Sequence, residues 1–293
     1  MFLYIFNLIT NVTTAMKRIL FPTDFSETAR NAFIYALNFA DSFKAELVLL
    51  HVYDLPIVET PPLPETTTEI FDIVEMHQFE SFREELPALH KLAEDNNFGH
   101  IKFKNVLMYG DLIYNINKVS EDEGVDFVIM GTKGASGLKE TFLGSTTASV
   151  ISNVQVPVLG IPAEAQYRAI KNIAFTTQYK DKDNDALRNA LTIGSAFNAR
   201  LQCLYIKNDD DPEDIEERIN EWKIYYRDEH IDFFNIDGDH IEQTILDFIE
   251  NQHVDLLVMR THKRGFFESL FHRSLTKKMA YHSKVPLLVF HEE

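Results

Sequence analysis

The sequence contains an internal repeat, and this repeat restricts the possible folds more than any other feature. Residues 17–24 (KRILFPTD) match residues 171–178 (KNIAFTTQ) at an offset of 154 positions. The same offset relates residues 45–52 to residues 199–206 without a gap. Self-similarity of this kind indicates two tandem copies of one structural unit. The length of 293 residues is also sufficient for two domains, each with its own core.

The second copy is shorter in its middle than the first. Residues 125–130 match residues 254–259, and residues 156–159 match residues 285–288, now at an offset of 129. The change of offset places a deletion between the second and fourth apolar runs of the second copy. Surface connections tolerate such deletions most easily.

These matches define the expected domain boundaries. We predict a first domain over residues 16–162 and a second over residues 169–293, joined by residues 163–168. Residues 1–15 form an N-terminal extension, in which the apolar run is far shorter than the roughly 20 residues of a transmembrane helix. This length predicts no membrane span, and the absence of a cation before the run argues against a secretory signal.

Short apolar runs alternate with helical patterns in each copy. In the first copy, strands are expected at 19–22, 47–52, 103–108, 127–130 and 156–161, helices at 28–43, 71–93 and 112–121, and a proline-rich loop at 53–65. This alternation predicts an α/β fold, in which a parallel sheet is covered by helices on both faces. The two last strands, 156–161 and 285–290, have exposed edges that need cover.

Composition narrows the possible partners and compartment. The chain has 28 Lys and Arg against 45 Asp and Glu, a net charge of −17, which disfavours a nucleic-acid partner. A single cysteine, Cys203, excludes an intramolecular disulfide framework and a Cys-rich zinc module. A reducing cytoplasm fits this composition, although a protein without disulfides can occur in any compartment.

A glycine-rich motif follows the fourth strand of the first copy. Gly131-Thr132-Lys133-Gly134 comes directly after Met130, and Gly144-Ser145-Thr146 opens the next helical segment. Glycines let backbone N–H groups approach an anion closely, and a helix N-terminus carries about half a positive charge. The motif therefore indicates a phosphate site, where Lys133 adds a cation. Asp24 follows the first strand and would line the same crevice if these two strands are neighbours.

The combination of Pro22-Thr23-Asp24, His51-Val52 and Gly131-x2-Gly134-x9-Gly144-Ser145 resembles the universal stress protein family. The resemblance covers both copies and matches the ATP-binding branch of that family. It implies a Rossmann-like sheet of five parallel strands in the order 3-2-1-4-5 in each domain. It also implies binding of ATP, or of AMP or ADP, with Mg²⁺. The implied site residues are Pro22, Thr23, Asp24, Val52, Met130, Gly131, Thr132, Lys133, Gly134, Gly144, Ser145 and Thr146.

The resemblance also implies a role for several of these positions. Asp24 would contact the adenine–ribose side, and the backbone of Val52 would bind the adenine edge. Gly131 and Gly134 would flank ribose and phosphates, while Gly144, Ser145 and Thr146 would hold the phosphates and share Mg²⁺. Structural alternatives remain open for each. In these alternatives, Asp24 or Ser26 only caps the following helix, Val52 belongs only to the core, and the glycines only end a strand.

The second copy lacks this motif. Arg260, Lys263 and Arg273 replace the three glycines, and Gln178 replaces Asp24, so we predict no ATP binding of the family type there. The replacements belong to a basic cluster: Arg260, His262, Lys263, Arg264, Arg273, Lys277 and Lys278. We favour surface charge, or packing against acidic neighbours across the vacant cleft, over anion binding by these side chains.

The family resemblance implies a cytoplasmic ATP-binding regulatory protein of the stress response. We further expect the nucleotide to act as a conformational switch that orders residues 132–143, because it can shift only an equilibrium between states that it binds differently. The alternative is a nucleotide-independent interaction or chaperone-like protein with the same fold. No catalytic residue set is evident, so ATP hydrolysis is expected to be slow at most. The two domains are expected to form an intramolecular pseudo-dimer, while homodimerisation and the protein partner are left open.

Overall fold

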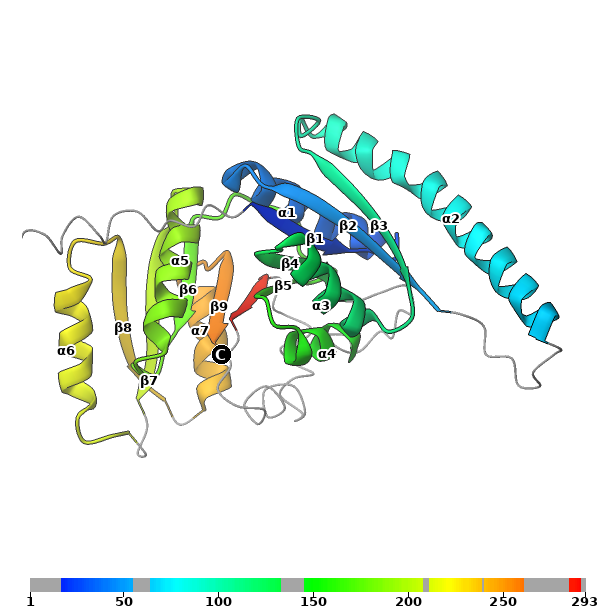
Figure 1. Ribbon diagram of the computed structural model, residues 1–293. Coiled ribbons are helices and arrows are strands. Elements are labelled where there is room, and N and C mark those ends of the chain that lie inside the picture. The colour runs from blue at the N-terminus through cyan, green and yellow to red at the C-terminus, as the bar shows by residue number, and fades with distance from the viewer. Residues whose placement is uncertain are drawn as a thin grey trace, which may run out of the picture.

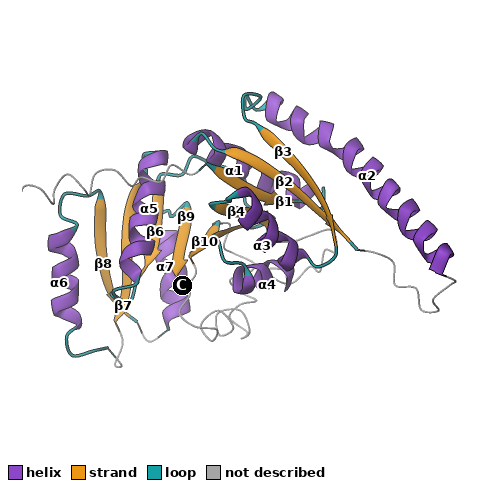
Figure 2. Ribbon diagram, viewed as in Figure 1, coloured by secondary structure: helices purple, strands orange, loops and turns teal. Residues whose placement is uncertain are grey.

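The computed structural model describes residues 17–54, 64–132, 145–207, 211–238, 240–260 and 285–290. Within them, ten strands form one continuous sheet in the order β3-β2-β1-β4-β5-β10-β9-β6-β7-β8 (Figure 1). Helices cover both faces of this sheet (Figure 2). The first half of the chain supplies five adjacent strands, and the second half supplies the other five.

The first half follows the expected alternation of strand and helix. In α1, for example, the buried residues include Ala32, Phe33, Ala36 and Leu37, a stripe with helical period that faces the sheet. The elements are β1 (Arg18–Pro22), α1 (Glu27–Phe43), β2 (Glu46–Tyr53), α2 (Pro64–Asp95), β3 (Phe103–Tyr109), α3 (Leu112–Glu123), β4 (Phe127–Gly131), α4 (Ser145–Asn153) and β5 (Val158–Ile161).

The second half repeats this plan with a much shorter second helix. Helix α2 has 32 residues and its counterpart α6 has 11, which accounts for most of the deletion in the second copy. The counterpart of α4 falls in residues 261–284, outside the described residues. The elements are β6 (Asn172–Thr176), α5 (Asp183–Phe197), β7 (Arg200–Lys207), α6 (Ile215–Tyr225), β8 (Ile231–Asp237), α7 (Ile241–Asn251), β9 (Leu256–Arg260) and β10 (Leu287–Phe290).

Both halves have the strand order that the family resemblance implied. In the first half, Ile19 of β1 is in register with Leu47 of β2 on one side and with Phe127 of β4 on the other. In the second half, β6 lies in the same way between β7 and β9. The strands within each half are parallel. The predicted fold class, two tandem α/β units of order 3-2-1-4-5, is confirmed.

The two halves join through their last strands. Strand β5 pairs antiparallel with β10, and Leu159 lies opposite Leu288. Each strand thereby covers the edge that the other would otherwise expose. Helices α1 and α5 also meet at this junction, where the ring centroids of Phe39 and Phe197 are 4.8 Å apart.

Prolines shorten the two joining strands relative to the sequence prediction. Strand β5 begins at Val158 and β10 at Leu287, two residues later than expected. Pro157 and Pro286 precede them and have no N–H to donate, so each contributes only its carbonyl to the neighbouring strand. The carbonyl of Pro157, for example, accepts a hydrogen bond from the N–H of Val128 at 2.9 Å, a normal hydrogen-bond distance.

The loop predicted over residues 53–65 is wrong at both ends. Tyr53 is the last residue of β2, and α2 already begins at Pro64, where a proline is favourable because the first helical N–H groups have no intrahelical partner. Residues 55–63 lie outside the described residues.

Even α2 is not apolar enough to cross a bilayer, and the same holds for every other described helix.

The hydrophobic core has two layers, one on each face of the sheet. One layer lies under α1, α2, α5 and α6, and the other lies under α3, α4 and α7. In β1, Ile19 and Phe21 point into the first layer and Leu20 into the second. A central parallel strand is therefore buried on both faces, which is why it reads as an unbroken apolar run.

Candidate functional site

The carboxyl ends of β3, β2, β1 and β4 surround a cavity of about 500 Å³. Ligands of parallel α/β sheets bind at the carboxyl ends of the strands, near the point where the strand order reverses. Asp24 and Gly131 both lie at this cavity, because β1 and β4 are neighbours. The predicted site residues that line it are Pro22, Thr23, Asp24, Val52, Met130, Gly131 and Thr146.

The loop between β1 and α1 is held by its own polar side chains. Thr23 Oγ1 accepts the N–H of Phe25 at 3.0 Å, and Asp24 Oδ1 accepts the N–H of Ser26 at 3.1 Å. Ser26, rather than Asp24, is the N-cap of α1, since its hydroxyl accepts the N–H of Ala29. Asp24 lies exposed at the cavity mouth, next to this cap.

His51 fixes the same loop from the adjacent strand. Its Nδ1–H donates to the carbonyl of Thr23 at 2.8 Å. The imidazole ring stacks on Phe82 of α2, at an interplanar angle of 14°, and also contacts Phe25. His51 thus connects α2 to the backbone that carries Asp24, one residue before the predicted adenine contact Val52.

The backbone of Val52 points into the cavity. The carbonyl of Leu50 accepts the N–H of Thr23, so Leu50 presents its backbone groups toward β1. Backbone direction along a strand alternates, so Val52, two residues on, presents its N–H and carbonyl in the same direction. Beyond Thr23, β1 has ended. The main chain of Val52 therefore offers one donor and one acceptor to a ligand.

The junction of β4 and α4 forms the opposite wall. Thr147 Oγ1 donates to the carbonyl of Gly131 at 3.1 Å and holds the start of α4 against the end of β4. Helix α4 begins at Ser145, and the exposed Thr146 in its first turn lines the cavity. The free N–H groups of this turn attract an anion.

The remaining predicted residues have different positions. Thr132 is buried, its N–H donates to the carbonyl of Ile161 at 2.8 Å, and it is not part of the cavity wall. Lys133, Gly134 and Gly144 lie outside the described residues, and the structure describes Ser145 only as the first residue of α4.

Two carboxylates at the cavity were missed in the sequence. Asp54 follows β2, and Asp111 follows β3 as the N-cap of α3, where it accepts the N–H of Tyr114 at 2.8 Å. Both come directly after apolar runs, and the Gly110-Asp111 turn before a helix is a recognisable signal. With Asp24, they make the β1–β3 side of the cavity acidic, and no cation is among the described residues that line it.

A magnesium ion would depend on the nucleotide for most of its ligands. The described part of the chain contains no group of three or more His, Cys, Asp or Glu that is placed to hold a metal ion. Mg²⁺ is commonly held by phosphate oxygens and water with one or two protein ligands, which this site can accommodate.

In the second half, an ion pair occupies the equivalent position. Arg260 takes the place of Gly131, and Asp183 takes the place of Ala29, which also lines the first cavity. The Nε–H of Arg260 donates to Asp183 Oδ1 at 2.7 Å, and both side chains are buried. Of the basic cluster, only Arg260 lies within the described residues, and it packs against an acidic neighbour.

Asp183 is held by further donors. Its second carboxylate oxygen accepts hydrogen bonds from the Thr177 hydroxyl at 3.0 Å and from the Gln178 N–H at 2.9 Å. Because these groups belong to the loop after β6, the ion pair ties α5, β9 and this loop together. The guanidinium thereby fills space that is open beside Gly131 in the first half.

Comparisons with known proteins agree with this architecture. The model of the universal stress protein family matches residues 16–162 and 226–291. Universal stress protein MJ0577 of Methanocaldococcus jannaschii is 35% identical over 153 residues, which cover 49% of this chain and 93% of that protein. Universal stress protein YxiE of Bacillus subtilis is 27% identical over 143 residues, covering 49% of this chain and 97% of that protein.

A solved structure extends the likeness to both halves. The crystal structure of a universal stress protein from Archaeoglobus fulgidus superposes with a TM-score of 0.71, covering 94% of this chain and 97% of that chain at 21% identity. Residues 169–225 fall outside the family match, yet they form β6, α5, β7 and α6 in the same arrangement as the first half.

Proposed function

The chain belongs to the universal stress protein family, and on that premise we propose that it is an ATP-binding regulatory protein of the stress response. The nucleotide site is the cavity of the first half, residues 16–162. One observation carries the proposal: the residues that match the nucleotide motif of the family come from three separate strands and line one cavity. The start of α4 and the main chain of Val52 add donors and an acceptor to that cavity.

The charge distribution of the cavity supports one orientation of the nucleotide. Asp24, Asp54 and Asp111 lie on the β1–β3 side, where they repel phosphate and accept hydrogen bonds from uncharged donors such as the adenine amino group and ribose hydroxyls. Phosphates belong on the opposite side, at Gly131 and the first turn of α4. Mg²⁺, when bound there, neutralises phosphate charge.

We propose that the second half, residues 169–293, binds no nucleotide in this way. Arg260 occupies the space beside the end of β9, and its pairing with Asp183 keeps it there. The expected stoichiometry is therefore one nucleotide per chain. A cytoplasmic location and a protein partner that reads the nucleotide state are part of the same proposal.

Regulation by nucleotide requires two states of the protein that bind it differently. Residues 132–143, of which 133–143 lie outside the described residues, belong to the connection between β4 and α4. Their ordering by nucleotide stays a prediction. Hydrogen exchange that is slower across this segment with MgATP supports it, and unchanged exchange contradicts it.

Isothermal titration calorimetry of the full chain with MgATP tests the proposed function. We expect saturable binding with one site, and a gain of about 2.7 kcal/mol in stability when the nucleotide is at 100 times its Kd. Gly131→Val should abolish both, because a branched side chain enters the space of the nucleotide. Gly99→Val, an exposed change in the same half, is the matched control. Absence of binding heat from the unaltered chain would overturn the proposal and leave a nucleotide-independent role.

A further inference from the structure

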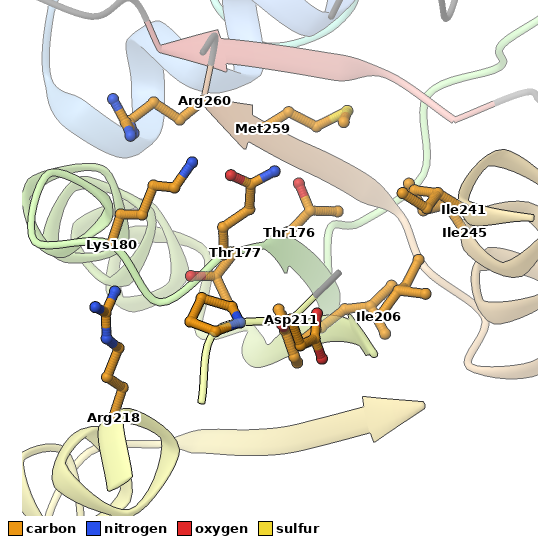
Figure 3. Close-up of a pocket in the computed structure, with 14 residues that line it drawn as sticks. Thr176, Thr177, Lys180, Ile206, Asp211, Arg218, Ile241, Ile245, Met259 and Arg260 are labelled. Carbon is orange, nitrogen blue, oxygen red and sulfur yellow. The ribbon is translucent and has the colours of Figure 1, made fainter. Parts of the chain in front are cut away.

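The second half has a cavity of its own. It measures about 340 Å³ and lies at the carboxyl ends of β6, β7 and β9, beside the start of α7 (Figure 3). Thr176, Thr177 and Gln178 line it at the positions that Pro22, Thr23 and Asp24 have in the first half. The Asp183–Arg260 ion pair therefore narrows this space without filling it.

One wall of this cavity is cationic. Lys180, Arg218 and Arg260 lie on the same side of the view in Figure 3. The guanidinium of Arg260 is fixed by Asp183, whereas the ammonium of Lys180 is exposed and forms no ion pair with the described residues. Arg218 pairs with Asp214 one helical turn away, a partly exposed contact that costs little to exchange.

The opposite wall is apolar. Ile206, Ile241, Ile245 and Met259 lie across the cavity from the cations (Figure 3). Ile241, in the first turn of α7, is 38% exposed. This wall leaves apolar surface within reach of a ligand, which gains free energy when that surface is buried.

Among the described residues, the charges of the two cavities are opposite in sign. The described lining of the first has three carboxylates and no cation. The described lining of the second has three cations and one carboxylate, Asp211, which accepts a hydrogen bond from the Tyr205 hydroxyl. In a chain of net charge −17, this reversal selects a different class of ligand.

We propose that the cavity of the second half binds a small organic anion with an apolar body. Its carboxylate or phosphate head group contacts Lys180 and Arg218, beside Arg260, and its chain or ring packs on Ile206, Ile241 and Ile245. Charged donors are the strongest partners for such a head group, and the volume suits a small metabolite. This site is independent of nucleotide binding in the first half.

NMR of the full chain with ¹³C-labelled isoleucine methyl groups provides the test, with sodium hexanoate as the probe. We expect saturable shifts of the Ile206, Ile241 and Ile245 methyl signals, and no such shifts with hexylammonium chloride. Inorganic phosphate should bind more weakly than hexanoate, because it lacks the apolar body. The double variant Lys180→Met, Arg218→Gln should weaken hexanoate binding at least about tenfold.

Lys223→Met is the matched control, since Lys223 is an exposed cation of α6 that does not line the cavity. It should leave hexanoate binding unchanged. The buried methyl signals of Ile173 and Ile193 report whether each variant keeps its fold. Three results would each overturn the proposal: no saturable shift up to about 10 mM hexanoate, equal shifts with hexylammonium, or full binding by the folded double variant.

Discussion

Asp183 and Arg260 form a 2.7 Å ion pair in which the two side chains are only 1% and 4% exposed. They replace Ala29 and Gly131 of the first half, so both members of the pair are specific to the second. Either charge alone would be buried without a counter-charge, which is strongly unfavourable. The narrowing of the second cavity is therefore a property of the pair and not of the arginine alone.

This coupling can be measured by a double-mutant cycle. Arg260→Met should lower the free energy of unfolding by about 3–5 kcal/mol, because it leaves the Asp183 carboxylate buried and unpaired. Adding Asp183→Asn should recover part of this loss, with a coupling of about 2 kcal/mol. Urea unfolding followed by the fluorescence of Trp222, the single tryptophan, measures it. The exposed pair of Arg200 and Asp232 is the control and should show far weaker coupling; equal coupling would contradict the interpretation.

His51 is expected to support nucleotide binding through the loop that it holds. His51→Phe keeps the stacking on Phe82 and removes the N–H that donates to the Thr23 carbonyl. Stability should fall by about 1 kcal/mol, and the affinity for MgATP should fall severalfold because Asp24 is no longer positioned. Calorimetry compares this variant with His100→Gln, which changes an exposed histidine of the same half. Unaltered affinity in His51→Phe would remove the positioning role.

Gly110 is required by the backbone at the end of β3. Its φ is +98°, a backbone conformation that residues other than glycine rarely adopt. No atom lies within 4 Å of the position that a Cβ would take. Gly110→Ala should therefore cost about 1–2 kcal/mol through backbone strain alone. Gly99→Ala, at a glycine without positive φ, should stay within about 0.5 kcal/mol of the unaltered chain. Equal thermal denaturation of the two variants would be inconsistent with this account.

We expect the buried hydroxyl of Tyr35 to make the protein less stable at alkaline pH. Burial raises the pKa of Tyr35 to about 12, and its hydroxyl donates to the carbonyl of Gln166. The unfolded chain ionises near pH 10 and the folded chain later, so the contribution of Tyr35 is complete below pH 10 and is lost as pH rises toward 12. Tyr35→Phe should therefore show a smaller fall in melting temperature between pH 9 and about 11. The same fall in both proteins would refute the assignment.

The internal repeat made most of the fold predictable from the sequence. The offset of 154 makes β6 the sequence counterpart of β1, and β7 the counterpart of β2. The alternation of apolar runs with helical stripes indicates a parallel sheet. Strand order came from the resemblance to a family and not from the residues themselves. The starts of β5 and β10 were misplaced because the apolar sequence continues through Pro157 and Pro286. These prolines have no backbone N–H to donate, so the strand pairing begins after them.

The candidate site was predictable where the signal is local and not where it depends on distant contacts. Glycines and hydroxyls after a strand mark the β4–α4 wall from sequence alone. Asp183, in contrast, lies in a stretch of alternating lysine and aspartate that is typical of a solvated surface, and its partner is 77 residues away. Only the placement of β9 beside β6 shows that this carboxylate is buried and neutralised.

The antiparallel seam between β5 and β10 has a consequence for communication within the chain. The strands of the two halves run in opposite directions, so their carboxyl ends point to opposite sides of the sheet. The two cavities, which lie at these ends, therefore also lie on opposite sides. Among the described residues, the two cavities share no lining residue. The main-chain bonds of the seam and the ring contacts of Phe39 with Phe197 and of Phe127 with Phe290 join the two halves, so a structural change at one cavity has a continuous packed path toward the other.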